Sequence, residues 1–344
     1  MKFKKYTSIE NSYRSKYIMN VQDSINMGYC KDDFIVEEKV HGANFAIYYD
    51  GKELKGAKRS GFVGGDCENF FNSDKVLARY ESAVKKLFKI FNSPVRVVGE
   101  IYGGQYEHPN IKKVKGIKRV QKGVDYNPDV DFIAFDLSVL DSEFESWATI
   151  NKDKANEAFE KTGMFYAVPL FRGTLEECLA YPNAFKSTIP SRLGLPEHPS
   201  ENICEGVVIK PVITSKLANG ERIVIKNKNE KFTEVAHGKK SNKKPKEAVK
   251  LTETGEKMKD MLVAHLTENR LRNVISKVGE VTQKDFGKLM GLFTSDAIED
   301  FEKDYSEEFN SLEDKEQKLI KKYFGGKAAE LIRKNFLNII DGIF

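Results

Sequence analysis

EEKVHGAN, at residues 37–44, is the stretch of this sequence that decides its fold. Lys39 stands three positions before Gly42, at the expected end of a strand. The glycine allows a tight backbone turn, and a strand end presents the amine to a cleft, where lysine can act as a nucleophile on a nucleotide phosphate. The alternative is a solvent-facing lysine before an ordinary turn, and the rest of the chain has to decide between the two.

The sequence around this stretch predicts a mixed α+β domain. Short segments rich in Val, Ile, Phe and Tyr, bounded by Gly, Asn and Pro, predict strands at Asn44–Asp50, Val95–Ile101, Asp131–Val139, Ile203–Pro211 and Arg222–Lys228. Helical patterns lie between them at Ser73–Phe91 and Asn151–Thr162. The spacing is irregular, which favours largely antiparallel sheets over a doubly wound fold.

The C-terminal part has a different character. Residues 237–250 hold six lysines and one acid and indicate a solvated linker. Beyond them Leu262, Leu266, Leu271, Val274, Ile275 and Val278 follow a helical period that Gly279 would end. Ser295 and Ser311 are expected to begin two further helices, with Gly325–Gly326 separating the last of these from a final helix that ends near Ile340. We expect no strand in this part.

Composition restricts the class of protein. A chain of 344 residues with 40% apolar residues can form two cored domains, and 56 basic residues nearly balance 51 acidic ones, for a net charge of +5. The four cysteines never form a C-x-x-C pair, so neither a disulfide framework nor a zinc site is expected. The sequence shows no signal peptide and no apolar run of about 20 residues. We therefore expect a soluble cytoplasmic protein (host cytoplasm if viral), with no membrane association and no obligate protein partner.

Six segments in order, of which the lysine motif is the first, give the chain a family resemblance. They are KVHGAN (39–44), AKRSG (57–61), VVGEIYGG (97–104), FIAFD (132–136), EGVVIKP (205–211) and IVIKNKNEKF (223–232). In this order and spacing the chain resembles the covalent nucleotidyltransferase superfamily of ligases and capping enzymes, and within it the phage-type RNA ligase 2 family. Residues 269–291, NRLRNVISKVGEVTQKDFGKLMG, resemble the C-terminal module of that family. His41 stands where DNA ligases and capping enzymes have aspartate, which also favours RNA ligase 2.

The resemblance implies an architecture and a reaction. It implies an α+β nucleotidyltransferase domain (ATP-grasp-like) at 1–234, a basic linker at 235–250 and an all-helical RNA-ligase module at 251–344. The implied activity is ATP-dependent RNA ligation with Mg²⁺. Lys39 takes AMP from ATP, AMP passes to an RNA 5′-phosphate, and a 3′-hydroxyl attacks to release AMP. The resemblance favours nicks in duplex RNA as the substrate.

Two lysines in the last motif offer a reason why Lys39 could react. Strand alternation places Lys226 and Lys228 on one face and Ile223 and Ile225 on the other. Two ammonium groups that face one site repel a third, which favours the neutral amine, and they can bind the α-phosphate. Alternatively, both lysines only coat a sheet surface.

The resemblance assigns further roles in the nucleotide site. Beside Lys39, Lys226 and Lys228, the nucleotide-binding residues it implies are Glu38, His41, Asn44, Arg59, Glu100, Phe135 and Lys210. Glu205 is the implied Mg²⁺ ligand and Glu100 the contact to the ribose. Simple alternation places Glu205 and Lys210 on opposite faces, so a twist or bulge must lie between them if both reach the nucleotide. From the pattern alone Phe135 is a core residue, whereas the resemblance has it stack on adenine.

RNA contacts are expected in three places. Asn44 and Arg59 are implied at the RNA end, and Arg270 and Asp296 match polar positions of the family module. Whether Arg270 and Asp296 touch RNA or join helices as an ion pair stays open. Residues 112–122, KKVKGIKRVQK, hold six basic groups and no acid, and either bind a phosphate backbone or are simply solvated.

Three rival interpretations remain. A DNA ligase or capping enzyme shares the motifs, but His41 and the helical C-terminal part disfavour both. A non-catalytic RNA-binding protein on the same scaffold would not need an intact Lys39, Glu205, Lys226 and Lys228. An end-healing enzyme with kinase activity would need a G-x-x-x-x-G-K-[ST] loop, which the sequence lacks.

Overall fold

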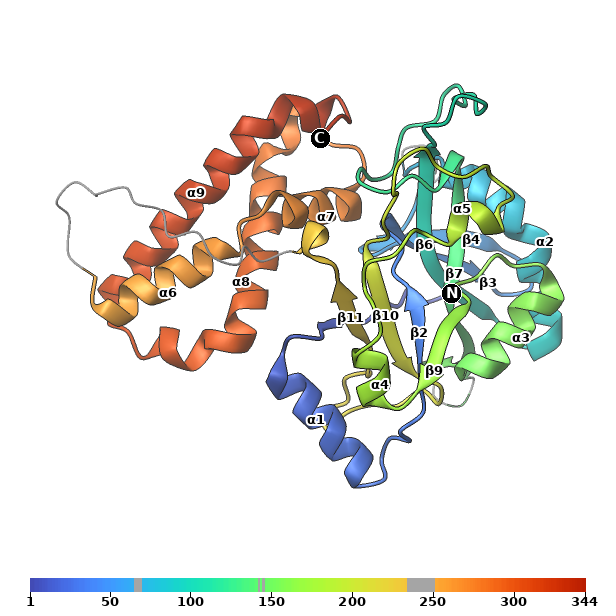
Figure 1. Cartoon of the computed structure of the whole chain (residues 1–344), viewed down its shortest axis with the longest axis horizontal. Helices are drawn as coiled ribbons and strands as arrows, with labels where there is room; N and C mark the ends of the chain where they lie inside the picture. The colour runs from blue at the N-terminus through green and yellow to red at the C-terminus, as the bar shows by residue number, and fades with distance from the viewer. Residues whose placement is uncertain (65–69, 142, 144–145, 234–250) are drawn as a thin grey trace. The chain divides into compact units, whose positions relative to one another are not determined.

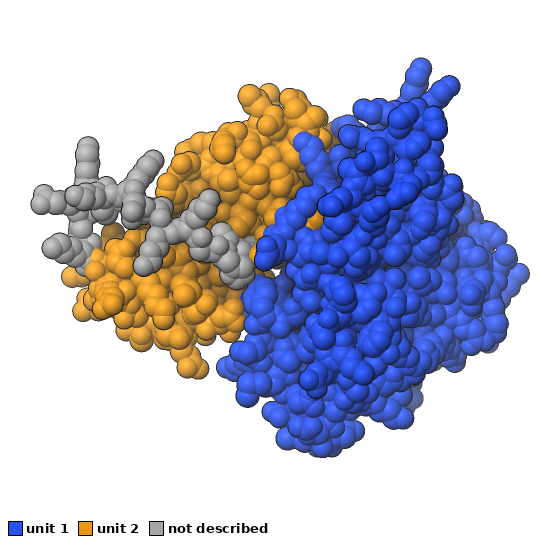
Figure 2. All heavy atoms as spheres, in the orientation of Figure 1, with its two compact units in different colours: residues 1–231 blue, residues 232–344 orange. Residues whose placement is uncertain are grey.

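The structure is a computed structural model that describes residues 1–64, 70–141, 143, 146–233 and 251–344. The chain forms two compact units, Met1–Lys231 and Phe232–Phe344, which Figure 2 shows in different colours. The predicted linker at 235–250 lies outside the described residues, so the predicted boundaries 1–234, 235–250 and 251–344 stay a prediction. None of the helices in the described part is long and apolar enough to cross a membrane.

Unit 1 contains two mainly antiparallel sheets (Figure 1). The six-stranded sheet has the order β5-β4-β3-β6-β7-β8, formed by β3 (Ala43–Tyr49), β4 (Leu54–Lys58), β5 (Gly61–Phe62), β6 (Val95–Gln105), β7 (Asn127–Asp141) and β8 (Ser146–Thr149). The five-stranded sheet has the order β1-β11-β10-β2-β9, formed by β1 (Glu10–Asn11), β2 (Phe34–Glu38), β9 (Pro169–Gly173), β10 (Gly206–Pro211) and β11 (Ile225–Lys228). Only β1 and β11 pair in parallel among these ladders.

Helices bury one face of each sheet. On the six-stranded sheet, α2 (Ser73–Phe91) and α3 (Lys152–Thr162) close a core that includes Phe45, Phe132 and Phe159. On the five-stranded sheet, α1 (Ser15–Asn26) and α4 (Leu175–Leu179) cover a core built on alternate strand residues such as Val207, Ile209 and Ile225. The residues between these alternate positions therefore face away from the helices, and the site is built on that side. A short helix, α5 (Ile189–Arg192), completes the unit.

Unit 2 is helical in its described part. It contains α6 (Glu253–Ala264), α7 (Glu268–Val278), α8 (Phe286–Asn310) and α9 (Asp314–Ile340), with short 3₁₀ turns η2 (Glu230–Phe232) at the unit boundary and η3 (Gln283–Asp285) before α8. Two apolar clusters hold the helices together, one around Met258, Phe301 and Phe324 and the other around Leu271, Phe293 and Ile332.

The structure confirms the α+β class, the antiparallel sheets and the helical C-terminal part, but it corrects the helix limits there. Leu262 and Leu266 do not share a helix with Leu271, because α6 ends at Ala264 and Thr267 caps α7 through its side chain. Gly279 does end α7. Ser295 lies in the exposed middle of α8, and Ser311 is the C-cap of that helix.

Gly325–Gly326 also fails as a helix break. Both glycines lie inside α9, which runs to Ile340 as expected at its end. A glycine in a helix interior costs about 1 kcal/mol relative to alanine, and α9 offsets this cost because it packs against both apolar clusters through residues such as Ile320 and Ile332.

Candidate active site around Lys39

Lys39 follows directly on β2. Its backbone N–H donates to the carbonyl of Gly206 (2.9 Å), which extends the β2–β10 ladder by one step. The chain then turns at Gly42, where a Cβ atom would collide with the carbonyl of Ile101, so the turn requires glycine. The Lys39 side chain is 15% exposed, so its amine is reachable from solvent while the carboxylate it contacts is buried.

Glu205 is the centre of the charged cluster at this turn. One carboxylate oxygen lies 2.7 Å from the Lys39 ammonium nitrogen and 3.4 Å from Nδ1 of His41. The other lies 2.8 Å from the ammonium nitrogen of Lys228. One buried carboxylate therefore joins residues from three separate sequence motifs.

Glu205 and Lys210 can reach the same face of the sheet only if the strand does not alternate regularly between them. Gly206 provides this irregularity. Its φ is +145°, and a Cβ there would overlap the carbonyl of Asn227. Val207 and Ile209 face the helix-covered core, so Lys210 lies on the other face of β10. Because the backbone is irregular at Gly206, Glu205 also reaches that face, where it meets Lys228.

The cluster gives two nearby carboxyl groups opposite properties. Burial alone would raise the pKa of Glu205, but the charges of Lys228, Lys39 and His41 hold that pKa well below its usual range. Burial raises the pKa of Glu100 to about 8, although the charge of Lys39 opposes the shift. Burial likewise lowers the pKa of His41, against the attraction of Glu205. At neutral pH the site therefore holds an ionised Glu205 beside a largely protonated Glu100.

Asn44, Glu100 and Arg59 lie next to this cluster. Asn44 and Glu100 are direct partners in the β3–β6 ladder, and the amide of Asn44 donates to the carbonyl of Gly99 (3.3 Å). Arg59 follows β4, and its charge opposes the rise in the pKa of Glu100 that burial causes. Lys226 pairs with Val208 across the β10–β11 ladder and is partly buried.

Phe135 and Lys210 belong to a second cluster, between the two sheets. The Lys210 ammonium lies 4.8 Å from the centroid of the Phe135 ring and donates to the Phe135 carbonyl (3.1 Å). It also pairs with Glu37 (2.9 Å) and lies 3.6 Å from Asp136. Lys210 is 2% exposed, and no described contact joins it to Lys39.

Most of this second cluster is not predicted from the sequence. Lys152 is 1% exposed, pairs with Glu37 (2.5 Å) and donates to the Phe135 carbonyl (2.8 Å). Arg222 makes two hydrogen bonds to Asp136 (2.6 and 2.9 Å). Glu37 adjoins the lysine motif, but nothing in a single sequence links it to a lysine at position 152.

The side chain of Glu38 already accepts hydrogen bonds from other residues in this structure. Its carboxylate accepts from the hydroxyl of Ser187 (2.6 Å) and from the N–H and hydroxyl of Thr188 (2.8 and 2.7 Å). Burial raises the pKa of Glu38 against these hydrogen bonds. Any contact between Glu38 and the adenine base would therefore involve the backbone of Glu38 and not its carboxylate.

The described residues contain no cluster of three or more His, Cys, Asp or Glu side chains that could hold a metal ion. Mg²⁺ differs from the ions such clusters bind, because it is usually held by one or two carboxylates together with substrate phosphates and water. The ionised Glu205 beside Lys39 fits that mode.

Arg270 and Asp296 meet inside unit 2. The guanidinium of Arg270 contacts the carboxylates of Asp296 (2.7 Å) and Asp300 (2.6 Å), and Asp296 also accepts from Lys277 (2.6 Å). Arg270 is 1% exposed, whereas the side chain of Asp296 is 27% exposed. The ion pair therefore joins α7 to α8, which is the second of the two possibilities that the sequence left open.

Comparison with known families matches most of the chain. A family model described as "RNA ligase" matches residues 32–228, and one described as "T4 RNA ligase 2 C-terminal" matches residues 249–330. The mitochondrial RNA-editing ligase 2 of Trypanosoma brucei brucei is 30% identical over 88% of this chain and 83% of its own length. RNA-editing ligase 1 of the same organism is 28% identical over 83% of this chain and 73% of its own. These matches confirm the resemblance that the motifs indicate.

Solved structures of Naegleria gruberi RNA ligase are also similar. A variant with ATP and Mn shares 14% identity at a TM-score of 0.43, over 66% of this chain and 57% of that one. The same ligase with PPi shares 16% identity at a TM-score of 0.42, over 67% and 57%. This chain therefore spans little more than half the length of the Naegleria ligase chains.

Proposed function

Because this chain belongs to the RNA ligase family, we propose that it joins RNA ends with ATP through a covalent AMP adduct on Lys39. The observation that carries the proposal is the contact of Glu205 with both Lys39 and Lys228, at 2.7 and 2.8 Å. It brings a reachable amine, a second cation and an ionised carboxylate to one point of the fold. A lysine on an ordinary surface turn would have no such surroundings.

In the first step the neutral amine of Lys39 attacks the α-phosphorus of ATP. A nitrogen–phosphorus bond forms, the bond to the β-phosphate oxygen breaks, and pyrophosphate leaves with its electron pair. The ion pair between Lys39 and Glu205 has to open before this attack, because the nitrogen can attack only once it has lost its ammonium proton. Lys228 and Lys226 then stabilise the charge that develops on the α-phosphate.

Glu205 would hold Mg²⁺ together with the triphosphate, and the bound ion would offset negative charge there. The nucleoside would lie between the two clusters, with Phe135 against the adenine and Glu100 at the ribose. A protonated Glu100 can donate a hydrogen bond to a hydroxyl, which an ionised carboxylate cannot. Lys210 and Lys152 act on this site indirectly, because both hold the backbone of Phe135 in place.

The second and third steps move AMP to RNA and release it. The RNA 5′-phosphate attacks the adduct, so Lys39 is freed and a 5′–5′ pyrophosphate linkage forms. A 3′-hydroxyl then attacks the RNA phosphorus of that linkage, which forms the phosphodiester and expels AMP. We place Asn44 and Arg59 at the RNA end, since both adjoin Glu100, and we propose a nick in duplex RNA as the substrate.

The test is transfer of labelled AMP followed by sealing. Protein given α-labelled ATP and Mg²⁺ should carry label that acid releases, as expected of a phosphoramidate, and GTP should label it poorly. Lys39→Ala should carry none, whereas Lys89→Ala, on the exposed side of α2, should label like the wild type. Equal labelling of Lys39→Ala would show that the nucleophile is misassigned.

Matched substrates decide the rest of the proposal. Nicked RNA duplex, single-stranded RNA and nicked DNA duplex of one sequence are offered to the labelled protein. Preferential sealing of the RNA nick is expected. Sealing of the DNA nick at the same rate would indicate a DNA-directed member of the superfamily, and adduct formation without any sealing would contradict the ligase proposal.

A further inference from the structure

The segment between β6 and β7 carries a concentration of positive charge that the nucleotide site does not use. Residues 104–123, which we call the basic arm, contain six Lys or Arg residues and one acid. Its first two residues end β6, and from Tyr106 on the arm has no regular secondary structure and forms the teal loop at the top of unit 1 in Figure 1. Five of its lysines are exposed, at positions 112, 113, 115, 118 and 122.

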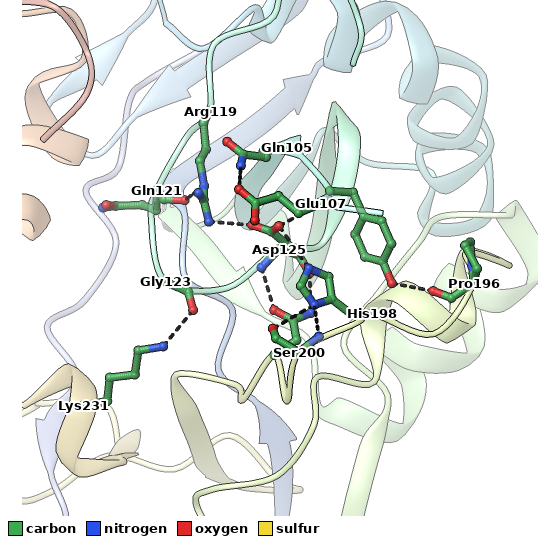
Figure 3. A network of polar contacts seen from close by, with 12 residues as sticks. Gln105, Glu107, Arg119, Gln121, Gly123, Asp125, Pro196, His198, Ser200 and Lys231 are labelled. Carbon is green, nitrogen blue, oxygen red and sulfur yellow. Dashed lines mark hydrogen bonds and ion pairs between the residues drawn. The ribbon is translucent and has the colours of Figure 1, made fainter. Parts of the chain in front are cut away.

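The base of the arm is held by a network of hydrogen bonds and ion pairs, which Figure 3 shows from close by. Asp125 is 5% exposed, and its carboxylate accepts from Arg119 (2.5 Å) and from the backbone N–H of Glu107 (3.0 Å) and lies 3.2 Å from Nε2 of His198. Its backbone exchanges two hydrogen bonds with the side chain of Asn202 (2.8 and 2.7 Å). One buried aspartate thus ties together both ends of the arm and the segment that carries residues 198–202.

Contacts with the sheet limit how much of the arm can move. The N–H of Val120 donates to the carbonyl of Gly103 (3.0 Å), and Val120 is buried in the core of the six-stranded sheet. Gly104 has φ +86° and would collide with the backbone of Lys118 if it carried a Cβ. The hydroxyl of Tyr106 donates to the carbonyl of Pro196 (2.5 Å). The part of the arm that projects is therefore short, and it carries the lysines at positions 112, 113 and 115.

The same base touches the turn that follows Lys39. The N–H of His41 donates to the hydroxyl of Tyr126 (2.9 Å), and the amide of Gln121 donates to the carbonyl of Gly42 (3.5 Å). The arm and the lysine turn are therefore fixed to each other by direct hydrogen bonds within unit 1. A polyanion that runs along the arm to its base would therefore meet the turn that follows Lys39.

We propose that the basic arm binds the sugar–phosphate backbone of the RNA next to the ends being joined. This inference rests on the proposed function for the identity of the polyanion. Arg119 is the arm residue best suited to bidentate recognition of a phosphate. Its guanidinium, however, already donates hydrogen bonds to Asp125 and to the carbonyl of Gln121. The exposed charges are lysines, which act as point charges on phosphates, so the contact reads the backbone and no base sequence.

A solvated charged loop is the competing explanation, since this chain is rich in charge. Such a loop would not need a buried aspartate, the left-handed Gly104 and contacts to the turn after Lys39 to hold it in place. The ion pairs of the described residues include none for Lys112, Lys113 or Lys115, whereas Lys85 on α2 pairs with Glu81 (2.6 Å). Three exposed lysines held close together on a fixed base give the arm a local field that attracts phosphate.

The experiment compares the triple variant Lys112→Gln/Lys113→Gln/Lys115→Gln with a matched control, Lys75→Gln/Lys86→Gln/Lys89→Gln. The control removes three exposed lysines from α2, so both variants change the net charge equally. Binding of a nicked RNA duplex is measured by fluorescence anisotropy over a range of salt concentrations, without ATP. Each lost phosphate contact lowers the slope of log K against log salt by about 0.9, so the arm variant should lose about 2 to 3 and the control close to none.

Three outcomes have a defined meaning. A reduced slope and weaker binding for the arm variant alone support the inference. Equal slopes for the arm variant and the wild type overturn it and leave an acidic protein surface as the partner to test next. An equal reduction in both variants also overturns it, because only net charge would then matter. Lysine–AMP formation needs no RNA and is measured in parallel on all three proteins, so its failure in the wild type would contradict the proposed function separately.

Discussion

The ammonium nitrogen of Lys39 lies 2.7 Å from Oε2 of Glu205, although 166 positions of sequence separate the two residues. The strand pairing of β2 with β10 brings them together, since Glu38 is opposite Val207, the Lys39 N–H then bonds to the carbonyl of Gly206, and Glu205 directly precedes Gly206. Strand pairing also brings Glu205 to Lys228, because β11 pairs with the other edge of β10. The middle position of β10 in the sheet therefore makes Glu205 the residue that assembles the site.

Glu205→Gln should cut lysine–AMP formation by a factor on the order of 10²–10³, because the amide keeps the shape but loses the charge that holds Lys39 and Lys228. The rate of labelling from α-labelled ATP at saturating Mg²⁺ measures it. Glu201→Gln, in the exposed segment four residues earlier, is the control and should label normally. A Glu205→Gln protein that labels at the wild-type rate would remove this carboxylate from the chemistry.

Glu100 should make the protein less stable as the pH rises. Its pKa in the folded state is about 8 because of burial, whereas an unfolded glutamate titrates near ~4.3. Between these values the folded state keeps a proton that the unfolded state has lost, so the free energy of unfolding falls with increasing pH. At about 1.36 kcal/mol per pKa unit, the loss would be roughly 5 kcal/mol across that window.

Glu100→Gln removes the titrating group, so its free energy of unfolding should decline less between pH 5 and 8 than that of the wild type. Urea unfolding at a series of pH values in metal-free buffer measures the difference. Parallel curves for the two proteins would show that Glu100 titrates normally in the folded state.

The features predicted correctly from sequence are those that local pattern decides. Ser73–Phe91 was predicted with the limits that α2 has, because its apolar residues at helical spacing form the buried face of α2. The central strands were found within a few residues, since β-branched and aromatic residues alternate in them. By contrast β2 was not delimited, because all five of its residues are buried and its sequence, FIVEE, does not alternate.

The part of the site that pattern could not reveal depends on tertiary pairing. Lys152 starts α3, an ordinary position for a solvated lysine, yet it is buried against Glu37 because the helix begins where the two sheets approach. Nor does the sequence show that Glu38 is held by Ser187 and Thr188. Such pairs join residues more than a hundred positions apart, and local periodicity carries no signal for them.

Phe135→Leu should raise the apparent KM for ATP by up to about 10-fold with little change in stability. The Phe135 ring is partly buried, packing against Tyr6 at 5.4 Å and under the Lys210 ammonium. An aromatic stack contributes about 0.5–1.5 kcal/mol beyond burial, which corresponds to that factor. Phe132→Leu is the matched control, three residues earlier in β7 but fully buried in the helix-covered core, and should lower stability with KM unchanged. A Phe135→Leu protein that loses stability and keeps its KM would make Phe135 a core residue.

Arg270→Ala should destabilise unit 2 by about 3–5 kcal/mol, because it leaves two carboxylates next to each other without the buried cation between them. The guanidinium contacts Asp296 and Asp300 at 2.7 and 2.6 Å and is nearly inaccessible to solvent. Chemical denaturation, followed through the helical signal in circular dichroism, measures this loss of stability. Lys334→Ala, an exposed site on α9, is the control and should change stability by less than about 0.5 kcal/mol.

Binding measurements separate this structural role from a direct contact with RNA. If Arg270 only joins α7 to α8, the conservative variant Arg270→Lys should recover part of the stability and RNA binding should recover in proportion. Asp300→Asn should also weaken RNA binding in proportion to the stability that it loses, since Asp300 pairs with the same guanidinium. An Arg270→Lys protein with wild-type stability and strongly reduced RNA binding would contradict the structural role, because the lost function would then follow the guanidinium itself and not the helix packing that it supports.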